Sequence, residues 1–140
     1  SMPMPMLYQH PGEDFERFLA DAKERADLVT RNQTYTMVEA VFHVFGRRLR
    51  LDEGLRFAVL LPPVLRALFL DAWAFDRPVV PFADRAASTR EVQSFRGNHN
   101  FAPDTAIAAV AAALRAEVDP ARFDEVIATL PSGARDFWAV

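Results

Sequence analysis

The residues best suited to binding chemistry lie together in one short polar segment, Arg96-Gly97-Asn98-His99-Asn100. Its guanidinium, amide and imidazole groups concentrate hydrogen-bond donors and acceptors, and functional residues favour loops that rigid elements hold in place. We therefore take Arg96, Asn98, His99 and Asn100 as a candidate binding loop for a small ligand or a partner. The competing interpretation is structural: Gly97 ends a helix in the left-handed conformation, and its neighbours bond exposed backbone groups.

No catalytic residue is predicted. Ser94 lies close to His99 in the sequence, but the two do not form a motif that would activate a serine. The absence of cysteine excludes thiolate catalysis, disulfides and cysteine-based zinc sites. A glycine-rich phosphate loop, a nucleophile elbow and a dinucleotide fingerprint are also missing from the sequence. We expect no cofactor, and these observations favour a non-catalytic role over an enzymatic one.

A second candidate is the series Glu39, His43 and Arg47, spaced four residues apart on one predicted helix. Two ligands on one helix face can hold a metal ion. However, Ala108 and Ala112 stand at the corresponding places in the second copy of the repeat described below. Charge pairs four residues apart on a helix surface account for the same residues. We therefore expect surface ion pairs here and no metal site.

Arg47, Arg48 and Arg50 cluster at the predicted C-terminal end of the same helix. An arginine cluster can bind phosphate, which makes a weak nucleic-acid binder a further alternative. The formal net charge of −3 argues against it, because nucleic acids are bound through basic faces. We favour a role at the helix end, where cations meet unpaired carbonyl groups.

The elements that position these residues follow a pattern that occurs twice. Segment 36–69 recurs as segment 105–138 at a constant offset of 69 residues, with low identity but coincident apolar positions. The pattern predicts two equivalent halves of four helices each. It also predicts a shared structural role for the equivalent arginines, such as contact with a carboxylate or a helix-end carbonyl. The equivalent pairs include Leu61-Pro62 with Leu130-Pro131 and Arg66 with Arg135.

Apolar residues recur every three to four positions through most of the chain, which is typical of amphipathic helices. We predict an all-α bundle of about eight helices in two duplicated four-helix halves, with Phe45, Leu114, Trp73 and Trp138 in its core. No membrane span is expected, because the longest apolar run is far shorter than the ~20 residues required. The expected helices are at about 14–26, 35–49, 53–60, 62–73, 83–96 and 104–117, followed by a short helix after Pro120 and another after Pro131.

The start of several helices is predicted from capping residues. Asn32 or Thr34 is expected to cap the second helix, Asp52 the third, and Asp119 the helix that begins with Pro120. Residues 1–13 are rich in proline and are expected to form an extended lead-in. Residues 14–140 are expected to form one domain, with halves at about 14–73 and 83–140.

The linker between the halves is predicted at residues 74–82, where two prolines interrupt any helix. We expect Val79, Val80 and Phe82 to lie on the core, with a short strand conceivable. The N-terminus lacks the charged and apolar regions of a signal peptide, so we expect a cytoplasmic protein.

Two long stretches of the chain resemble a known family. The pattern AVFxxFGRRL…LRFAVLLPPVLRALFxxxW, followed by EVQxFRxNHNFAPDTAIAAVAAALRxxVD…F…LPxGAxDFW, is similar to a bacterial protein family catalogued as domain of unknown function 2267. The resemblance extends from about Asp14 to Trp138. It implies an all-α fold, and it implies no activity, cofactor or catalytic residue.

The function favoured by the sequence is an interaction or structural domain with a protein partner. A continuous exposed apolar patch would support this interpretation. The first alternative is a small-ligand-binding protein or enzyme, which a pocket lined by at least two polar residues of the 96–101 loop would support. The nucleic-acid alternative predicts that Arg47, Arg48, Arg85 and Arg90 gather on one face.

Overall fold

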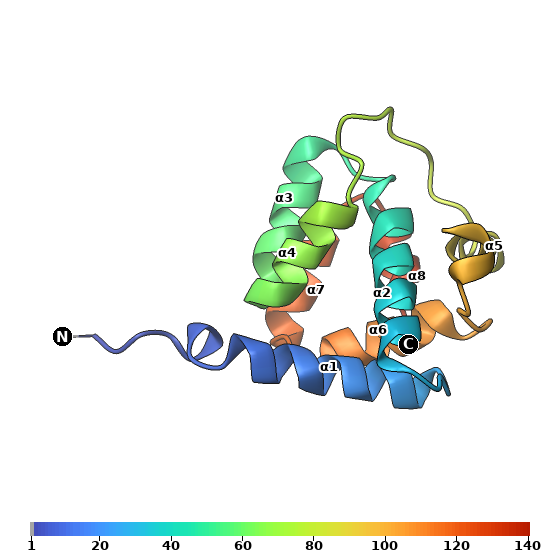
Figure 1. The fold of residues 1–140 in the computed structure, drawn as a ribbon. Coiled ribbons are helices and arrows are strands. Elements are labelled where there is room, and N and C mark those ends of the chain that lie inside the picture. The colour runs from blue at the N-terminus through green and yellow to red at the C-terminus, as the bar shows by residue number, and fades with distance from the viewer. Residues whose placement is uncertain (1) are drawn as a thin grey trace.

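The protein is all-α, as predicted, in a computed structural model that describes residues 2–140. Figure 1 shows the helices gathered into one bundle, with the N-terminal residues extending away from it. This part of the chain contains eight α-helices, two short 3-10 helices and no β-strand. The elements in chain order are η1 (Met6–Tyr8), α1 (Pro11–Arg25), α2 (Arg31–Gly46), α3 (Leu51–Leu60), α4 (Pro63–Ala72), α5 (Arg85–Ser94), η2 (Gly97–His99), α6 (Ala106–Arg115), α7 (Pro120–Ala128) and α8 (Gly133–Phe137).

Helix α1 begins at Pro11, three residues before the predicted start at about position 14. Proline suits the first turn because the amide it lacks would have no partner there. Glu13 and Asp14 follow in the same turn, where the helix dipole favours acidic groups. The extended lead-in is therefore shorter than predicted, and it contains the single turn of η1.

Helix α2 begins earlier than predicted because Thr30 caps it. The Thr30 hydroxyl accepts from the Gln33 amide at 3.0 Å, and the Gln33 side chain accepts from the Thr30 amide at 3.1 Å. This reciprocal capping box satisfies two amides that the helix leaves unpaired. The prediction of Asn32 or Thr34 as the cap was wrong. Thr34 is fully buried and bonds the Thr30 carbonyl.

The start of α3 also differs from the prediction of an Asp52 cap. The Glu53 carboxylate accepts from the Arg50 amide at 2.8 Å, whereas Asp52 lies inside the first turn and pairs with Arg56. Asp119 does cap α7 as predicted, because its carboxylate accepts from the Arg122 amide at 2.9 Å.

The Leu61-Pro62 corner separates α3 from α4, as predicted. The Arg66 guanidinium reaches back across it and donates to the carbonyls of Ala58, Val59 and Leu61 at 3.1–3.3 Å. This confirms helix-end binding for Arg66. Arg135 does not repeat it: Arg135 is exposed and lines a surface concavity beside Pro131 and Asp136.

The linker between α4 and α5 is irregular. The short strand that the sequence analysis considered for this segment is not formed. The Val80 amide donates to the Arg47 carbonyl at 3.0 Å, which holds the linker on the end of α2. Phe82 packs against the core, as predicted, and lies 6.0 Å from Phe45 between ring centroids. Val79 was predicted to be on the core but is half exposed, because the linker contacts the bundle only on either side of it.

Helix α5 packs on the bundle through Ser88, Thr89 and Val92, which are buried. Phe95, which follows the helix, also packs against the core, whereas Ala83 precedes the helix and is exposed. The Thr89 hydroxyl donates to the Arg85 carbonyl at 2.7 Å, so part of the polar burial is compensated within the helix.

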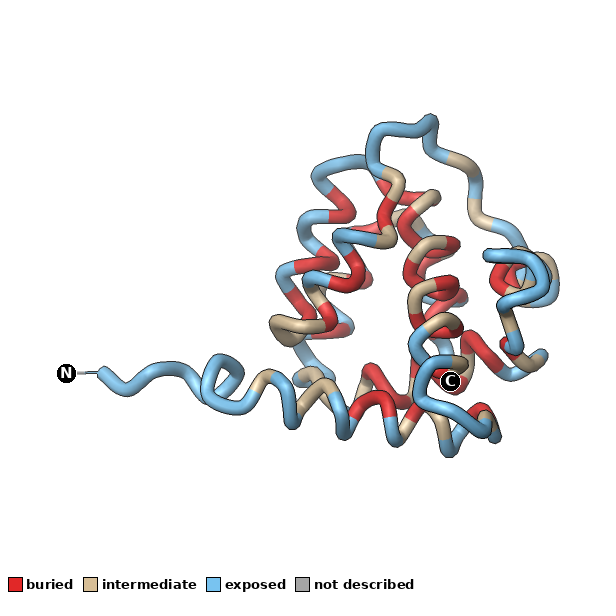
Figure 2. The backbone as a smooth tube through the Cα atoms, viewed as in Figure 1, coloured by how far each residue is buried: buried red, intermediate tan, exposed pale blue. Residues whose placement is uncertain are grey.

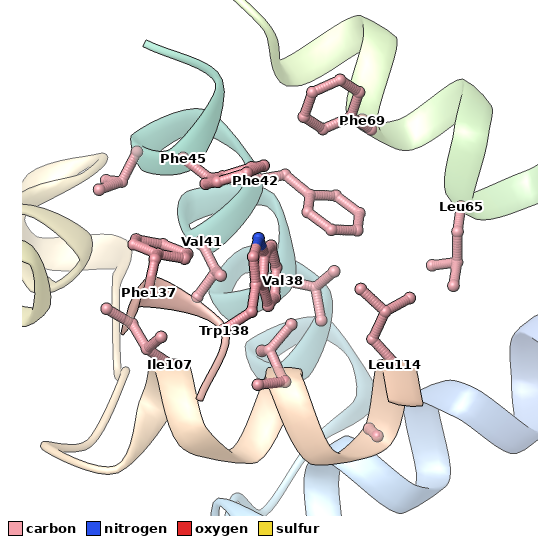
Figure 3. Close-up of a cluster of buried hydrophobic side chains, with 14 of the residues drawn as sticks. Val38, Val41, Phe42, Phe45, Leu65, Phe69, Ile107, Leu114, Phe137 and Trp138 are labelled. Atoms are coloured by element: carbon pink, nitrogen blue, oxygen red, sulfur yellow. The ribbon is translucent and has the colours of Figure 1, made fainter. Parts of the chain in front are cut away.

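The core contains a cluster of aromatic rings from helices α2, α3 and α4 and from the C-terminal turn. Trp138 is fully buried; it stacks on Phe57 at 5.5 Å and lies 5.1 Å from Phe45 between ring centroids. Figure 3 shows Trp138 lying between the side chains of α2 and Leu114 of α6. Phe45 and Leu114 are both fully buried, as predicted. A ring cluster of this size supplies apolar burial together with favourable edge and stacking contacts.

Two arginines tie the C-terminal turn to the bundle. Arg85 donates through Nη2 to the carbonyls of Asp136, Phe137 and Ala139 at 2.8–2.9 Å. Arg115 donates to the Trp138 carbonyl at 3.0 Å. Burial lowers the pKa of Arg85 from its ordinary value. These bonds hold the backbone of the turn that carries the buried Trp138.

Candidate functional site

The predicted binding loop lies between α5 and α6 and contains η2. Arg96 adopts a left-handed conformation with φ of 61°, which is rare for a residue with a side chain. Its guanidinium makes a double hydrogen bond to the Glu39 carboxylate of α2 at 2.9 and 3.0 Å. The hydrogen bond that Arg96 donates to Glu39, together with the negative charge of Glu39, raises the pKa of Arg96. Arg96 therefore links the loop to α2.

Asn100 also has a structural role. Its amide nitrogen donates to the carbonyls of Val92 and Phe95 at the end of α5, and its oxygen accepts from the Ala102 amide at 2.8 Å. One side chain thus satisfies helix-end carbonyls and the next backbone turn together. The hydrogen bond from Asn100 to the Val92 carbonyl joins the end of the loop to the last turn of α5. Asn100 is therefore committed to the fold, in agreement with the structural interpretation.

Asn98 and His99 remain exposed. None of the five concavities that we describe on residues 2–140 is lined by a residue of the 96–101 loop. The structure thus separates the four predicted site residues: two hold the loop in place and two face solvent. The pocket expected for the ligand-binding alternative is not found among these concavities.

The series Glu39, His43 and Arg47 is split among three different partners. Glu39 pairs with Arg96, His43 donates through Nδ1 to the Ala72 carbonyl at 2.9 Å, and Arg47 lies 3.6 Å from the Glu91 carboxylate. The predicted pairing along the helix was wrong, because neighbouring elements offer better partners. Within residues 2–140 no group of three or more His, Asp or Glu side chains is placed to hold a metal ion.

The arginine cluster at the end of α2 does not form a basic face. Arg48 is 3% exposed and donates to the Val44 carbonyl at 2.7 Å and to the Glu91 carboxylate at 2.8 Å. Arg50 lies 3.7 Å from both Asp52 and Glu53. The contact between Arg48 and Val44 confirms the expected helix-end role, and the carboxylates offset the positive charge that a phosphate would require.

A concavity beside α2 is lined by His43, Arg47 and Arg77, which suggests anion binding at first sight. The helix geometry argues against it. Helices α2 and α4 both end here, and unpaired carbonyls give helix C-termini a partial negative charge. His43 already donates to one such carbonyl, that of Ala72. The cations therefore complement the two helix ends.

The feature best suited to binding is an apolar surface on α3, in contrast to the polar and charged candidates above. Leu51, Leu55 and Val59 are 57%, 47% and 54% exposed, although they are among the larger apolar residues. Their spacing of four residues places them on one side of the helix. The other side of α3 buries Phe57 and packs on the core. Helix α3 is thus apolar on two sides, only one of which the fold covers.

This exposed side continues into a groove between α3 and α7, which lie side by side (Figure 1). The groove is open to solvent and has a volume of about 490 Å³. We call it, together with Leu51, the α3–α7 surface. The groove is lined by Leu55, Arg56, Val59, Arg122, Glu125, Val126 and Thr129.

Reciprocal bonds fix the two walls of the groove. Arg56 of α3 donates to the hydroxyl and the carbonyl of Thr129 at 3.2 and 3.3 Å. Arg122 of α7 donates to the Val59 carbonyl at 3.4 Å. Arg56 also pairs with Asp52, and this hydrogen bond lowers the pKa of the Asp52 carboxyl. The two arginines of the lining are therefore already bonded within the protein. Besides Thr129, the other lining residues are the apolar Leu55, Val59 and Val126 and the exposed Glu125.

Sequence reasoning missed this surface, although a signal was present. The α3 sequence LDEGLRFAVL carries apolar residues on more sides than a single core-facing stripe requires. At the offset of 69 residues used in the sequence analysis, the corresponding positions are Pro120, Asp124 and Ala128. The apolar row of α3 therefore has no counterpart at that offset.

The helical fold and this site define a helical domain with an apolar surface groove. The chain belongs to the family described as Uncharacterized conserved protein (DUF2267), whose match extends over residues 15–137. This agrees with the resemblance noted from the sequence. No curated protein matches the chain. Among the described helices, none combines the length and apolar character needed to cross a membrane.

Proposed function

We propose that this protein is a non-catalytic interaction domain that binds a protein segment through the α3–α7 surface. The observation that carries the proposal is the row of Leu51, Leu55 and Val59, which faces solvent beside a groove with fixed walls. Scattered apolar side chains on a surface are ordinary, but a contiguous apolar row next to a groove is typical of binding sites. Burial of such a row would contribute most of the binding free energy.

The chemistry of the groove favours an apolar segment without acidic residues as the partner. Arg56 and Arg122 already bond Thr129 and Val59, so an acidic segment would have to compete with existing hydrogen bonds. The apolar side chains of Leu55, Val59 and Val126 have no such competitor. The ligand-binding and nucleic-acid alternatives rest on the 96–101 loop and on the arginine cluster, both of which have structural partners.

Affinity purification from the native host tests the proposal. The wild-type chain, Val59→Asp and Val29→Asp serve as parallel baits. Val29 is a matched control because it is 79% exposed and lies in the turn before α2, outside the groove. We expect Val59→Asp to lose partners that Val29→Asp retains, with both variants as stable as the wild type. Equal retrieval by the three baits would contradict the proposal.

A further inference from the structure

The N-terminal residues Met2–Tyr8, which we call the arm, form a second exposed apolar feature. Met2, Met4 and Met6 are 93%, 57% and 71% exposed, and Leu7 and Tyr8 are also exposed. The arm carries no charged residue. Figure 2 shows it as a continuous exposed segment that leads away from the helices. The arm therefore offers an apolar, neutral segment that its own bundle does not cover.

Local interactions restrict the shape of the arm. Pro3 and Pro5 alternate with methionines, and Pro5 has the φ of −55° and ψ of 144° typical of a polyproline II segment. The single turn of η1 (Met6–Tyr8) follows, and the Gln9 side chain donates to the Met4 carbonyl at 2.7 Å across this turn. A segment whose shape is already restricted loses less conformational entropy on binding.

We infer that the α3–α7 surface of one copy of this protein binds the arm of a second copy. This inference rests on the proposed function and names the partner. Each copy carries one arm and one groove, so two copies can exchange arms in a closed pair with both apolar features buried. The arm projects away from its own bundle (Figure 1), which favours exchange over docking within one chain.

The chemistry of the two features is complementary. The groove presents Leu55, Val59 and Val126, and its rim arginines are already bonded, so it requires no carboxylate from the segment it binds. The arm has no charged residue and therefore brings no carboxylate into the groove. Methionine side chains are flexible and fill irregular apolar surfaces well. The second copy thereby contributes Met4 and Met6 to a site that is open in a single chain.

Self-association of the full chain, measured by sedimentation equilibrium, is the first test. We expect a dimer whose dissociation constant rises about tenfold or more in Met6→Asp and in Val59→Asp, because each variant places a charge in an apolar contact. The control variant Val29→Asp should leave the constant unchanged. A chain that remains monomeric at all concentrations, or a dimer that Met6→Asp leaves intact, would overturn the inference.

Disulfide trapping is the second test. Because the sequence contains no cysteine, only the introduced cysteines can form a disulfide. Met4→Cys and Val59→Cys are prepared as separate chains, mixed and oxidised. We expect the mixed disulfide dimer, and we expect none when Val29→Cys replaces Val59→Cys. A chain that carries both Met4→Cys and Val59→Cys and closes only on itself would show docking within one chain and overturn the inference.

The two proposals fail separately. If the chain is monomeric but retrieval of host partners still depends on Val59, the arm exchange is wrong and the interaction surface stands. If retrieval and self-association are both indifferent to Val59→Asp, the surface itself is wrong.

Discussion

The indole ring of Trp73 fills the space that a side chain at position 54 would occupy. A Cβ atom on Gly54 would lie 2.1 Å from Cζ2 and 2.2 Å from Cη2 of Trp73. Gly46 of α2 has a similar relation to the same ring, with a Cβ 2.7 Å from Cδ1. The missing side chains of Gly46 and Gly54 thus leave space for the Trp73 ring, which packs the end of α4 against both α2 and α3.

We predict that Gly54→Ala destabilises the protein by about 1–3 kcal/mol through overpacking, although alanine is favoured in helices by about 1 kcal/mol. Gly12→Ala in α1 is the control, because a Cβ there meets nothing within 4 Å. It should leave the stability unchanged or increase it. Chemical denaturation measures both variants, and equal stability of the two would contradict the packing that we describe.

Phe45→Ala should lower the free energy of unfolding by about 3–5 kcal/mol and Leu114→Ala by about 2–5 kcal/mol, through lost burial and a residual cavity. Both side chains are fully buried. Domains of this kind have a stability of about 5–15 kcal/mol, so either variant can leave the protein marginal. Phe101→Ala, at a position that is 59% exposed, is the control for loss of an aromatic ring. Denaturation losses under about 1 kcal/mol at the two core positions would refute these assignments.

Arg85→Gln should loosen the C-terminal turn, because Arg85 bonds three of its carbonyls. We expect a loss of about 1–3 kcal/mol, as for other hydrogen bonds to a charged group. Hydrogen exchange of the amides in residues 134–139 should accelerate. Arg135→Gln is the matched control at an exposed arginine and should change stability by less than about 0.5 kcal/mol. Unchanged exchange in Arg85→Gln would show that core packing alone holds the turn.

The two neighbouring residues of the 96–101 loop should respond differently to alanine. Asn100→Ala removes the side-chain donor to the carbonyls of Val92 and Phe95 and should cost about 1–3 kcal/mol. His99→Ala should be nearly neutral, since His99 is exposed. Thermal and chemical denaturation compare the two. Equal effects of the two substitutions would mean that the Asn100 bonds contribute little.

The two halves should superpose by a rotation that exchanges them. Arg25 and Ser94, which end α1 and α5, are 69 residues apart, as are Gly46 and Arg115, which end α2 and α6. Contacts across the halves exchange in the same way: α1 packs on α6 and α5 packs on α2. Helix α8 is shorter than α4 and departs from the pattern. An experimental structure in which α1–α3 and α5–α7 do not superpose would contradict the duplication.

The sequence alone was sufficient to predict the helical class, the Leu61-Pro62 corner and the core positions Phe45, Leu114 and Trp138. These features depend on local information, because apolar periodicity assigns a helix face and proline ends a helix. The cap of α2 was within reach of the same reasoning. Thr30 and Gln33 stand at capping-box spacing, but the later Asn32 and Thr34 were preferred.

The tertiary structure alone decided which partner each polar side chain binds and which apolar residues remain exposed. Glu39 was expected to pair along its own helix, yet it binds Arg96, which lies 57 residues further along the chain. Leu55 and Phe57 are both apolar and stand two residues apart on α3, but only Phe57 meets the core. Periodicity identifies a side of a helix, whereas contact with that side depends on how distant helices pack around it.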